Sequence, residues 1–391
     1  MKRLIIMDYL ARGRGGHNQI YSTTIAREAE KLGVAAEIWC PTNCAIESKH
    51  AKKVFSGMKP FGRLQLFRQI FERAKEFRQL INKPDLAEGD VVFFHTVSHP
   101  FFVSISLALF GIKLKPKMVI MMRRGLNDKY RSNLPSFVSE TVFWLMTAPF
   151  VLYLNRIENV IFATDSNLIA DELSNFGLRG VFTLPIHHVS AKGIYNVHRT
   201  IIGYFGGGRK EKGFTMLPNI VSLVLKKKAS SKFIIQTSIE KNYYFDSPAL
   251  LNARSDLFKM AKEYKGSIDI LDGAISYSAY EKAMEKCSII LLPYNADVYS
   301  QGTSGILAEA VAMGKWVVVP ANTWMAAQKE KYDKISVFDN ETPESIADAI
   351  LKCKLLESKL DRARVDGQIK KWQAYHNPKN YMRILMEGAK S

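Results

Sequence analysis

Cysteine is scarce in this chain, and the few residues present do not form a ligand set. The four cysteines are scattered, and Cys40 and Cys44 have no second Cys or His pair elsewhere that would complete a zinc site. The spacing therefore argues against structural zinc. We expect reduced thiols in a cytoplasmic protein.

Long apolar runs are also missing. A membrane-spanning helix needs about 18 or more consecutive apolar residues, and no stretch reaches that length. The longest candidate, from Thr141 to Leu154, is short and contains Pro149, which favours a buried or interfacial helix. The opening "KRLIIMDYL" reads as a β-strand and lacks the form of a signal peptide. These features predict a cytoplasmic location.

Acidic residues are too few to balance the basic ones. The chain has 55 Lys and Arg residues against 37 Asp and Glu residues, a net charge of +18. A surplus of this size indicates an anionic partner: nucleic acid, a lipid surface or a phosphorylated substrate. Both halves of the chain share the surplus equally, so only local clusters of charge discriminate among these partners.

Apolar strand-like runs alternate with helix-length segments along almost the whole chain. The first half contains "RLIIMDYL", "AAEIWC", "GDVVFFHT", "KMVIMMRR" and "NVIFAT". The second half contains "TIIGYFGG", "KFIIQTS", "SIDILDG", "CSIILLPY", "KWVVVP" and "ISVFD". Continuous apolar strands separated by helices are typical of parallel sheets covered on both faces. The sequence predicts an α/β protein with two doubly wound, Rossmann-like domains.

A polar segment without a clear period, from His187 to Arg199, marks the expected join between these domains. We expect an N-terminal Rossmann-like domain over residues 1–190 and a C-terminal one over residues 191–376. Residues 377–391 form a final helix that can pack back on the N-terminal domain.

One basic segment interrupts the alternation. Residues 49–83 hold ten Lys or Arg and two Glu, and apolar residues recur at helical spacing. The segment combines an aromatic face with basic flanks, represented by Phe61, Phe67, Phe71 and Phe77 and by Arg68 and Arg73. This combination is typical of a helix that lies on an anionic membrane. The alternative is an outer helix packed on the sheet, with a solvated basic face.

Two glycine-rich turns each follow an expected strand and precede a helix. The first, "GRGGHNQ", runs from Gly13 to Gln19 and is not a GxGxxG motif. It can present backbone N–H groups to an anion, or serve only as a tight connection. The second, "YFGGGRKEKGF", adds Arg209, Lys210 and Lys212 to three glycines. It lacks the GxxxxGK[ST] pattern, but cations beside exposed amides suit a diphosphate.

A third glycine-containing loop, "QGTSG", precedes the helical run "ILAEAVAMG". The loop residues Gly302, Thr303 and Ser304 therefore lie at a helix N-terminus, where free N–H groups and the helix dipole favour phosphate. Glu309 lies about one and a half turns into that helix. A carboxylate there can accept hydrogen bonds from two vicinal hydroxyls, as on a ribose.

This combination resembles the retaining glycosyltransferases of the GT-B fold, especially family 4. The family's donor signature is a Glu, seven residues, a second Glu, and then "A.G.PVV"; this chain has Gln301, seven residues, Glu309, and then "AVAMGKWVVVP". The resemblance implies that Glu309 binds the donor ribose and that Gln301 replaces the Glu that contacts the donor sugar. It also implies two domains that face a central cleft.

Other loops carry the resemblance further. Lys212 and Gly213 match the K-G of the family's diphosphate-binding loop, whose usual Arg position is Gly207, so Arg209 is displaced by two residues. Gly208 belongs to the same expected donor site. The turn of Gly15, Gly16 and His17 resembles the family's N-terminal turn, which faces donor phosphate and acceptor.

Candidate acceptor-side residues follow two strands of the first domain. His95 and His99 come after one strand, and Arg123 and Arg124 end the next. Arginine cannot act as a base, and retaining members of the resembled family generally need no dedicated protein base. No Asp-x-Asp follows a strand, so we expect neither a metal nor another cofactor.

The resemblance predicts an enzyme, a hexosyltransferase that moves a sugar from a nucleotide-diphosphate sugar to a lipid-linked or membrane-associated glycan. The expected location is the inner face of the cell membrane, on an anionic surface. Nucleic acid is not an expected partner, because the phenylalanines of the basic segment share one helical face and are not presented as stacking platforms. A non-catalytic basic membrane- or nucleic-acid-binding protein and a sugar-nucleotide epimerase on the same fold remain alternatives.

Overall fold

The computed structural model divides the chain into two compact units. It describes residues 2–9, 11, 17–56, 66–97, 99–126, 147–187, 200–228, 230–239 and 248–389, with only the backbone given for residues 17–20, 66–67 and 99–100. Unit 1 comprises Met1–His188 and Asn377–Ser391, and unit 2 comprises Val189–His376. No helix within these described ranges has both the length and the apolar character needed to cross a membrane.

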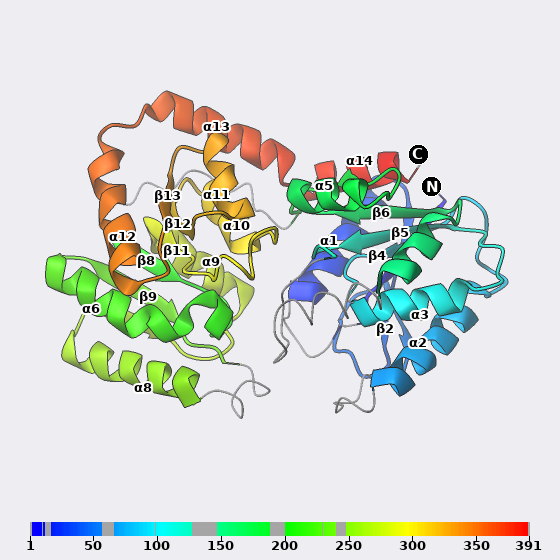
Figure 1. Cartoon of the computed structure of the whole chain (residues 1–391), viewed down its shortest axis with the longest axis horizontal. Coiled ribbons are helices and arrows are strands. Elements are labelled where there is room, and N and C mark those ends of the chain that lie inside the picture. The colour runs from blue at the N-terminus through cyan, green and yellow to red at the C-terminus, as the bar shows by residue number, and fades with distance from the viewer. Residues whose placement is uncertain are drawn as a thin grey trace. The chain divides into compact units, whose positions relative to one another are not determined.

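Unit 1 is built on a parallel sheet of seven strands in the order β3-β2-β1-β4-β5-β6-β7. Figure 1 labels β2, β4, β5 and β6 of this sheet. The strands are β1 (Arg3–Met7), β2 (Ala35–Pro41), β3 (Ala51–Phe55), β4 (Val91–Phe94), β5 (Lys117–Met122), β6 (Val160–Thr164) and β7 (Phe182–Thr183). The central strands are buried along their whole length, which explains their unbroken apolar sequences. The strand order reverses between β1 and β4, the position where doubly wound sheets open a crevice for ligands.

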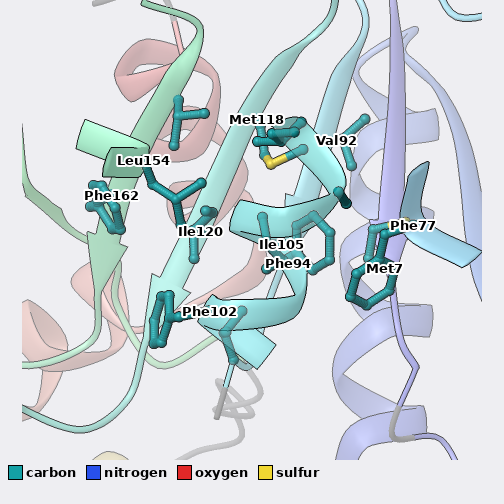
Figure 2. Close-up of a cluster of buried hydrophobic side chains, with 14 of the residues drawn as sticks. Met7, Phe77, Val92, Phe94, Phe102, Ile105, Met118, Ile120, Leu154 and Phe162 are labelled. Atoms are coloured by element: carbon teal, nitrogen blue, oxygen red, sulfur yellow. The ribbon is translucent and has the colours of Figure 1, made fainter. Parts of the chain in front are cut away.

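Helices cover both faces of this sheet. They are α1 (His17–Lys31), α2 (Leu66–Ile81), α3 (His99–Leu109), a helix over residues 147–155, α5 (Asn167–Asn175) and α14 (Pro378–Gly388). Figure 2 shows Phe77, Ile105 and Leu154, from three of these helices, packed with side chains of the strands. On the other face, α1 and α14 share a core with the sheet. The end of the chain therefore belongs to unit 1.

Unit 2 repeats the architecture with a six-stranded parallel sheet in the order β10-β9-β8-β11-β12-β13. Its strands are β8 (Ile201–Tyr204), β9 (Lys232–Gln236), β10 (Ile268–Leu271), β11 (Ile289–Leu291), β12 (Trp316–Pro320) and β13 (Ile335–Phe338). Its order reverses between β8 and β11. Both units are doubly wound, so the predicted fold class is confirmed.

The helices of unit 2 form two groups. α6 (Leu217–Lys227), α8 (Pro248–Glu263) and α12 (Pro343–Glu357) share one core with the sheet. α9 (Tyr277–Lys286) packs on β8, α10 (Gly305–Ala312) packs on β12, and α13 (Arg362–Tyr375) packs against α10. The short elements are η2 (Lys210–Lys212), η3 (Phe214–Met216), α11 (Trp324–Ala327) and η4 (Gln328–Glu330).

The structure corrects the interpretation of the basic segment. Phe77 is completely buried in the unit 1 core, and Arg73 is buried in an ion pair with Glu76, so neither can face a membrane. The apolar stripe of α2 is the face that packs on the domain, because the sheet needs a helical cover there. Phe71 and Arg68 are exposed. Phe61 and the side chain of Phe67 lie outside the described part of the chain.

This burial predicts opposite effects for two phenylalanines on the same helix. Phe77→Ala should destabilise the protein by about 3–5 kcal/mol, because it leaves a cavity in the core. Phe71→Ala should change the stability by less than about 0.5 kcal/mol, because Phe71 is 63% exposed. Thermal unfolding of the two variants, followed by near-ultraviolet circular dichroism, measures the difference. Equal melting temperatures would contradict the assigned faces of α2.

Candidate functional site

The backbone of the loop that follows β8 is tightly constrained at the carboxyl edge of the unit 2 sheet. Gly206 has a φ of 97° and Gly213 a φ of 70°, values that favour glycine. A Cβ on Gly213 would lie 2.0 Å from the carbonyl oxygen of Pro293. The Gly206 N–H donates to Gln236 Oε1 at 2.9 Å, and the Gly208 N–H donates to the Ser238 carbonyl at 2.5 Å. The end of β9, the residues after it and the segment after β11 therefore hold the loop in place.

Two cations lie on this loop. Lys212 Nζ is 3.3 Å from the point where a Cβ of Gly206 would be, and 5.3 Å from the ring centre of Tyr294. Arg209 Nε is 3.5 Å from the corresponding point on Gly207. Burial raises the pKa of Tyr299 to about 12, and the charges of Lys212 and Arg209 act against that rise. Both cations are therefore within electrostatic reach of one tyrosine.

The first turn of α10 meets the same loop. Ser304 caps the helix, its Oγ accepting from the Leu307 N–H at 3.3 Å, and its side chain opposes the rise that burial causes in the pKa of Tyr294. Ile306 Cδ1 is 3.2 Å from the Cβ position of Gly206. The preceding residues Gln301, Gly302 and Thr303 are half-buried. The structure thus brings the glycine loop, both cations and a helix N-terminus together, an arrangement whose positive field can attract an anion.

Glu309 lies buried in the second turn of α10, beside α9. The hydroxyl of Tyr280 donates to Glu309 Oε2, and the Tyr280 ring packs edge-on against Phe205, the residue after β8. Burial raises the pKa of Glu309 to about 8; the nearby charge of Glu281 adds to the rise, and the Tyr280 hydrogen bond opposes it. Burial therefore favours the protonated form of this carboxyl.

Four functional candidates of unit 2 were missed by the sequence analysis: Gln236, Tyr280, Tyr294 and Tyr299. Gln236 ends β9, Tyr280 lies in the first turn of α9, and Tyr294 and Tyr299 lie in the segment between β11 and α10. The signal in the sequence was the position after an apolar run, as in "FIIQ" and "LLPY". Their contacts with the loop join residues far apart in the chain, and no local pattern reports such contacts.

In unit 1, two of the predicted residues lie together at the carboxyl ends of β4 and β5. His95 is buried, with Nε2 at 3.2 Å from Ser22 Oγ and 3.4 Å from Asp8 Oδ1. Arg123 Nε donates to the His95 carbonyl at 3.1 Å, and its guanidinium lies 4.2 Å from the ring centre of Tyr21. The sequence analysis missed Asp8, Ser22 and Tyr21.

The other predicted residues of unit 1 are less informative. Arg124 is exposed. His17 and His99 begin α1 and α3, where only the backbone is described. Gly15 and Gly16 lie outside the described residues. Across the described ranges, no three His, Cys, Asp or Glu side chains are grouped so that they could hold a metal ion.

Comparison with known proteins gives a fold but no sequence family. No protein-family model matches the chain, and no curated protein matches it by sequence. Sucrose-phosphate synthase from Thermosynechococcus elongatus matches with a TM-score of 0.71 and 12% identity, over 99% of this chain and 98% of that chain. The Anabaena protein HepE, in complex with UDP and glucose, matches with a TM-score of 0.69 and 11% identity over 100% of both chains.

A third solved structure also matches over almost the full length of both chains. The trehalose-6-phosphate protein of Escherichia coli bound with UDP-2-fluoro glucose has a TM-score of 0.65 and 10% identity, over 100% of this chain and 99% of that chain. At such low identity the likeness shows the fold alone. The chain has the GT-B fold of two Rossmann-like domains.

The raised pKa of Glu309 predicts a pH dependence of stability. Its ordinary pKa is 4.5, so the folded chain holds this proton more tightly than the unfolded chain. The stabilisation is present at low pH and is lost as pH rises from about 4.5 to about 8. Glu309→Gln keeps a hydrogen-bond acceptor for Tyr280 without titrating. The melting temperature of the wild type should therefore fall relative to this variant across that window, and a constant difference would contradict the assignment.

Proposed function

We propose that the protein is a retaining glycosyltransferase that moves a sugar from a nucleotide-diphosphate sugar to a glycan acceptor. The observation that carries the proposal is the convergence of Arg209, Lys212 and the α10 N-terminus on one glycine loop. A diphosphate matches this arrangement in charge. The resemblance of Gln301, Glu309 and the following helix to the family 4 signature supports the same reading and favours that family.

The electrostatics of the loop suit the bond-breaking step. When the bond from the sugar to the nucleoside diphosphate breaks, negative charge builds up on the leaving phosphate. Arg209, Lys212 and the N–H groups at the start of α10 would stabilise that charge from positions already fixed by the fold. The acceptor hydroxyl would attack from the face that the leaving group vacates, which retains the configuration of the sugar.

Glu309 and Gln301 have separate roles in this proposal. Glu309 accepts from Tyr280 on one carboxylate oxygen and would accept from donor ribose hydroxyls on the other. Those hydroxyls would favour the ionised carboxylate, so donor binding releases a proton near neutral pH. Gln301, at the start of the loop before α10, would hydrogen-bond the sugar without adding a charge.

The acceptor would bind to unit 1, at the carboxyl edge where His95 and Arg123 lie. Two solved neighbours carry fitting ligands: HepE holds UDP and glucose, and a trehalose-phosphate synthase from Burkholderia xenovorans holds glucose-6-phosphate. We further propose that the acceptor is lipid-linked or otherwise membrane-associated, in polysaccharide or lipopolysaccharide-type assembly. The net charge of +18 supports work at the anionic inner face of the cell membrane.

The donor site predicts different effects for two lysines of the same turn. A thermal-shift screen of UDP-, GDP-, ADP- and dTDP-sugars identifies the nucleotide, because a bound ligand raises the melting temperature. Lys212→Ala should then weaken binding of that nucleoside diphosphate about tenfold to a hundredfold, as a charge-assisted hydrogen bond contributes about 1.5–3 kcal/mol. Lys210→Ala, an exposed neighbour, is the control and should bind normally. Equal affinities in the two variants, measured by calorimetry, would refute the role of Lys212.

Activity should not need a divalent metal. The positive field at the diphosphate comes from Arg209, Lys212 and helix N–H groups in this proposal, so sugar transfer should survive EDTA at wild-type rate. A magnesium-dependent glycosyltransferase assayed in the same buffer serves as the control. Complete loss of transfer in EDTA, restored by magnesium or manganese, would overturn this account of the donor site.

A further inference from the structure

The outer face of unit 1 contains a helix without a single charged side chain. No Lys, Arg, Asp or Glu occurs from Val91 to Ile112, a range that includes all of α3. Val103 and Leu107 of α3 are only half-buried, and Phe110, the residue after the helix, is 68% exposed. An outer helix of a globular domain ordinarily turns a polar face to water. The partly exposed side of α3 is apolar instead.

Its two neighbouring helices extend the apolar surface. α2 and α3 lie side by side (Figure 1), and Ser104 Oγ of α3 donates to the Ile70 carbonyl of α2 at 3.1 Å. On the other side, Ser106 Oγ donates to the Phe150 carbonyl of the helix over residues 147–155 at 3.2 Å. That helix also has no charged residue. The three helices therefore form one continuous layer.

Exposed apolar side chains of these helices gather around Phe110. The Tyr153 ring centre lies 6.1 Å from that of Phe110, and Leu152 next to it is 37% exposed. Arg78 Nη1 of α2 donates to the Phe110 carbonyl at 2.8 Å. Phe71 lies two helical turns before Arg78, hence on the same side of α2. We call this set the apolar surface: Phe71, Val103, Leu107, Phe110, Leu152 and Tyr153.

Basic side chains surround the apolar surface. They are exposed at its margins on all three helices: Arg68, Lys75 and Arg78 on α2, Lys113 and Lys115 after α3, and Arg156 after the third helix. The acidic residues in the same stretches are fewer, and Glu72 is paired with Arg68 at 2.7 Å. The margin therefore carries net positive charge around an uncharged centre.

We infer that the apolar surface docks on an anionic lipid bilayer. Aromatic and aliphatic side chains enter the interfacial layer, while the surrounding Lys and Arg contact the headgroups. A second copy of this chain fits less well, because two positively charged margins would repel each other. The inference rests on the proposed function only for its purpose, to bring the enzyme to a lipid-linked acceptor. The membrane contact is thus the apolar surface, and not the buried stripe of α2 that the sequence had suggested.

Flotation of the full chain with vesicles tests this docking. The wild type should bind vesicles that contain phosphatidylglycerol, bind phosphatidylcholine vesicles weakly, and dissociate with added salt. Phe71→Ser with Phe110→Ser should reduce the partition coefficient at least about tenfold, because two exposed rings no longer enter the interface. Lys113→Glu with Lys115→Glu should reduce it at least about fivefold for each residue.

A matched control lies in unit 2. Leu251 and Leu355 are exposed by 37% and 71%, outside any comparable surface, so Leu251→Ser with Leu355→Ser should leave vesicle binding unchanged. Melting temperatures of all variants check that the fold is kept. The inference is overturned if wild type ignores anionic vesicles, or if the Phe71/Phe110 variant floats like wild type. It is also overturned if wild type self-associates through this surface and that variant becomes monomeric without any vesicle binding.

The same samples separate this inference from the proposed function. Nucleoside diphosphate affinity should be equal in wild type and in the Phe71/Phe110 variant, since those residues belong to unit 1 and the donor site to unit 2. Vesicle binding without any nucleotide binding would leave the docking surface standing and refute the glycosyltransferase proposal. Nucleotide binding without vesicle binding would refute the docking surface and leave the glycosyltransferase proposal standing.

Discussion

The candidate site of unit 2 depends on the close approach of two loops at the carboxyl edge of its sheet. A Cβ at Gly213 would collide with the Pro293 carbonyl, so only glycine lets the loop after β8 lie against the loop after β11. That contact sets Lys212 against Tyr294, whose pKa is influenced in turn by Ser304, the cap of α10. The Asn295 N–H donates to the Glu211 carbonyl at 2.9 Å and ties the loops together. The positive field of the site is therefore prearranged by backbone packing.

Unit 1 uses the same edge of a parallel sheet for a different kind of polar cluster. Asp8, His95 and Arg123 each follow a strand, and they are held by Ser22 and Tyr21 of α1. The Tyr21 hydroxyl also donates to the Tyr381 hydroxyl of α14 at 2.9 Å, so the last helix of the chain supports this cluster. Asp8, Tyr21, Ser22 and His95 are buried and hold the partly exposed Arg123 in place, which suits a rigid surface for an acceptor.

The sequence predicted the fold because buried parallel strands have unbroken apolar sequences that alternate with helices, and this pattern is local. It also placed Arg209, Lys212 and Ser304 in glycine-containing loops on the carboxyl side of the sheet, because such loops are local as well. It could not predict that Tyr280 faces Glu309, since that contact joins two helices. It assigned Phe77 and Arg73 of α2 to a membrane although both are buried, because a core-facing stripe and a membrane-facing stripe have the same period. It overlooked α3, whose missing charge has meaning only once Phe110 is known to be exposed.

The central claim is that a nucleoside diphosphate binds between the loop after β8 and the start of α10. Amide hydrogen exchange of the full chain, with and without saturating UDP, GDP, ADP or dTDP, tests it most directly. The account predicts that one of these ligands slows exchange at residues 206–213 and 302–308, with little change elsewhere. Unchanged exchange in both segments, together with protection confined to unit 1, would contradict it.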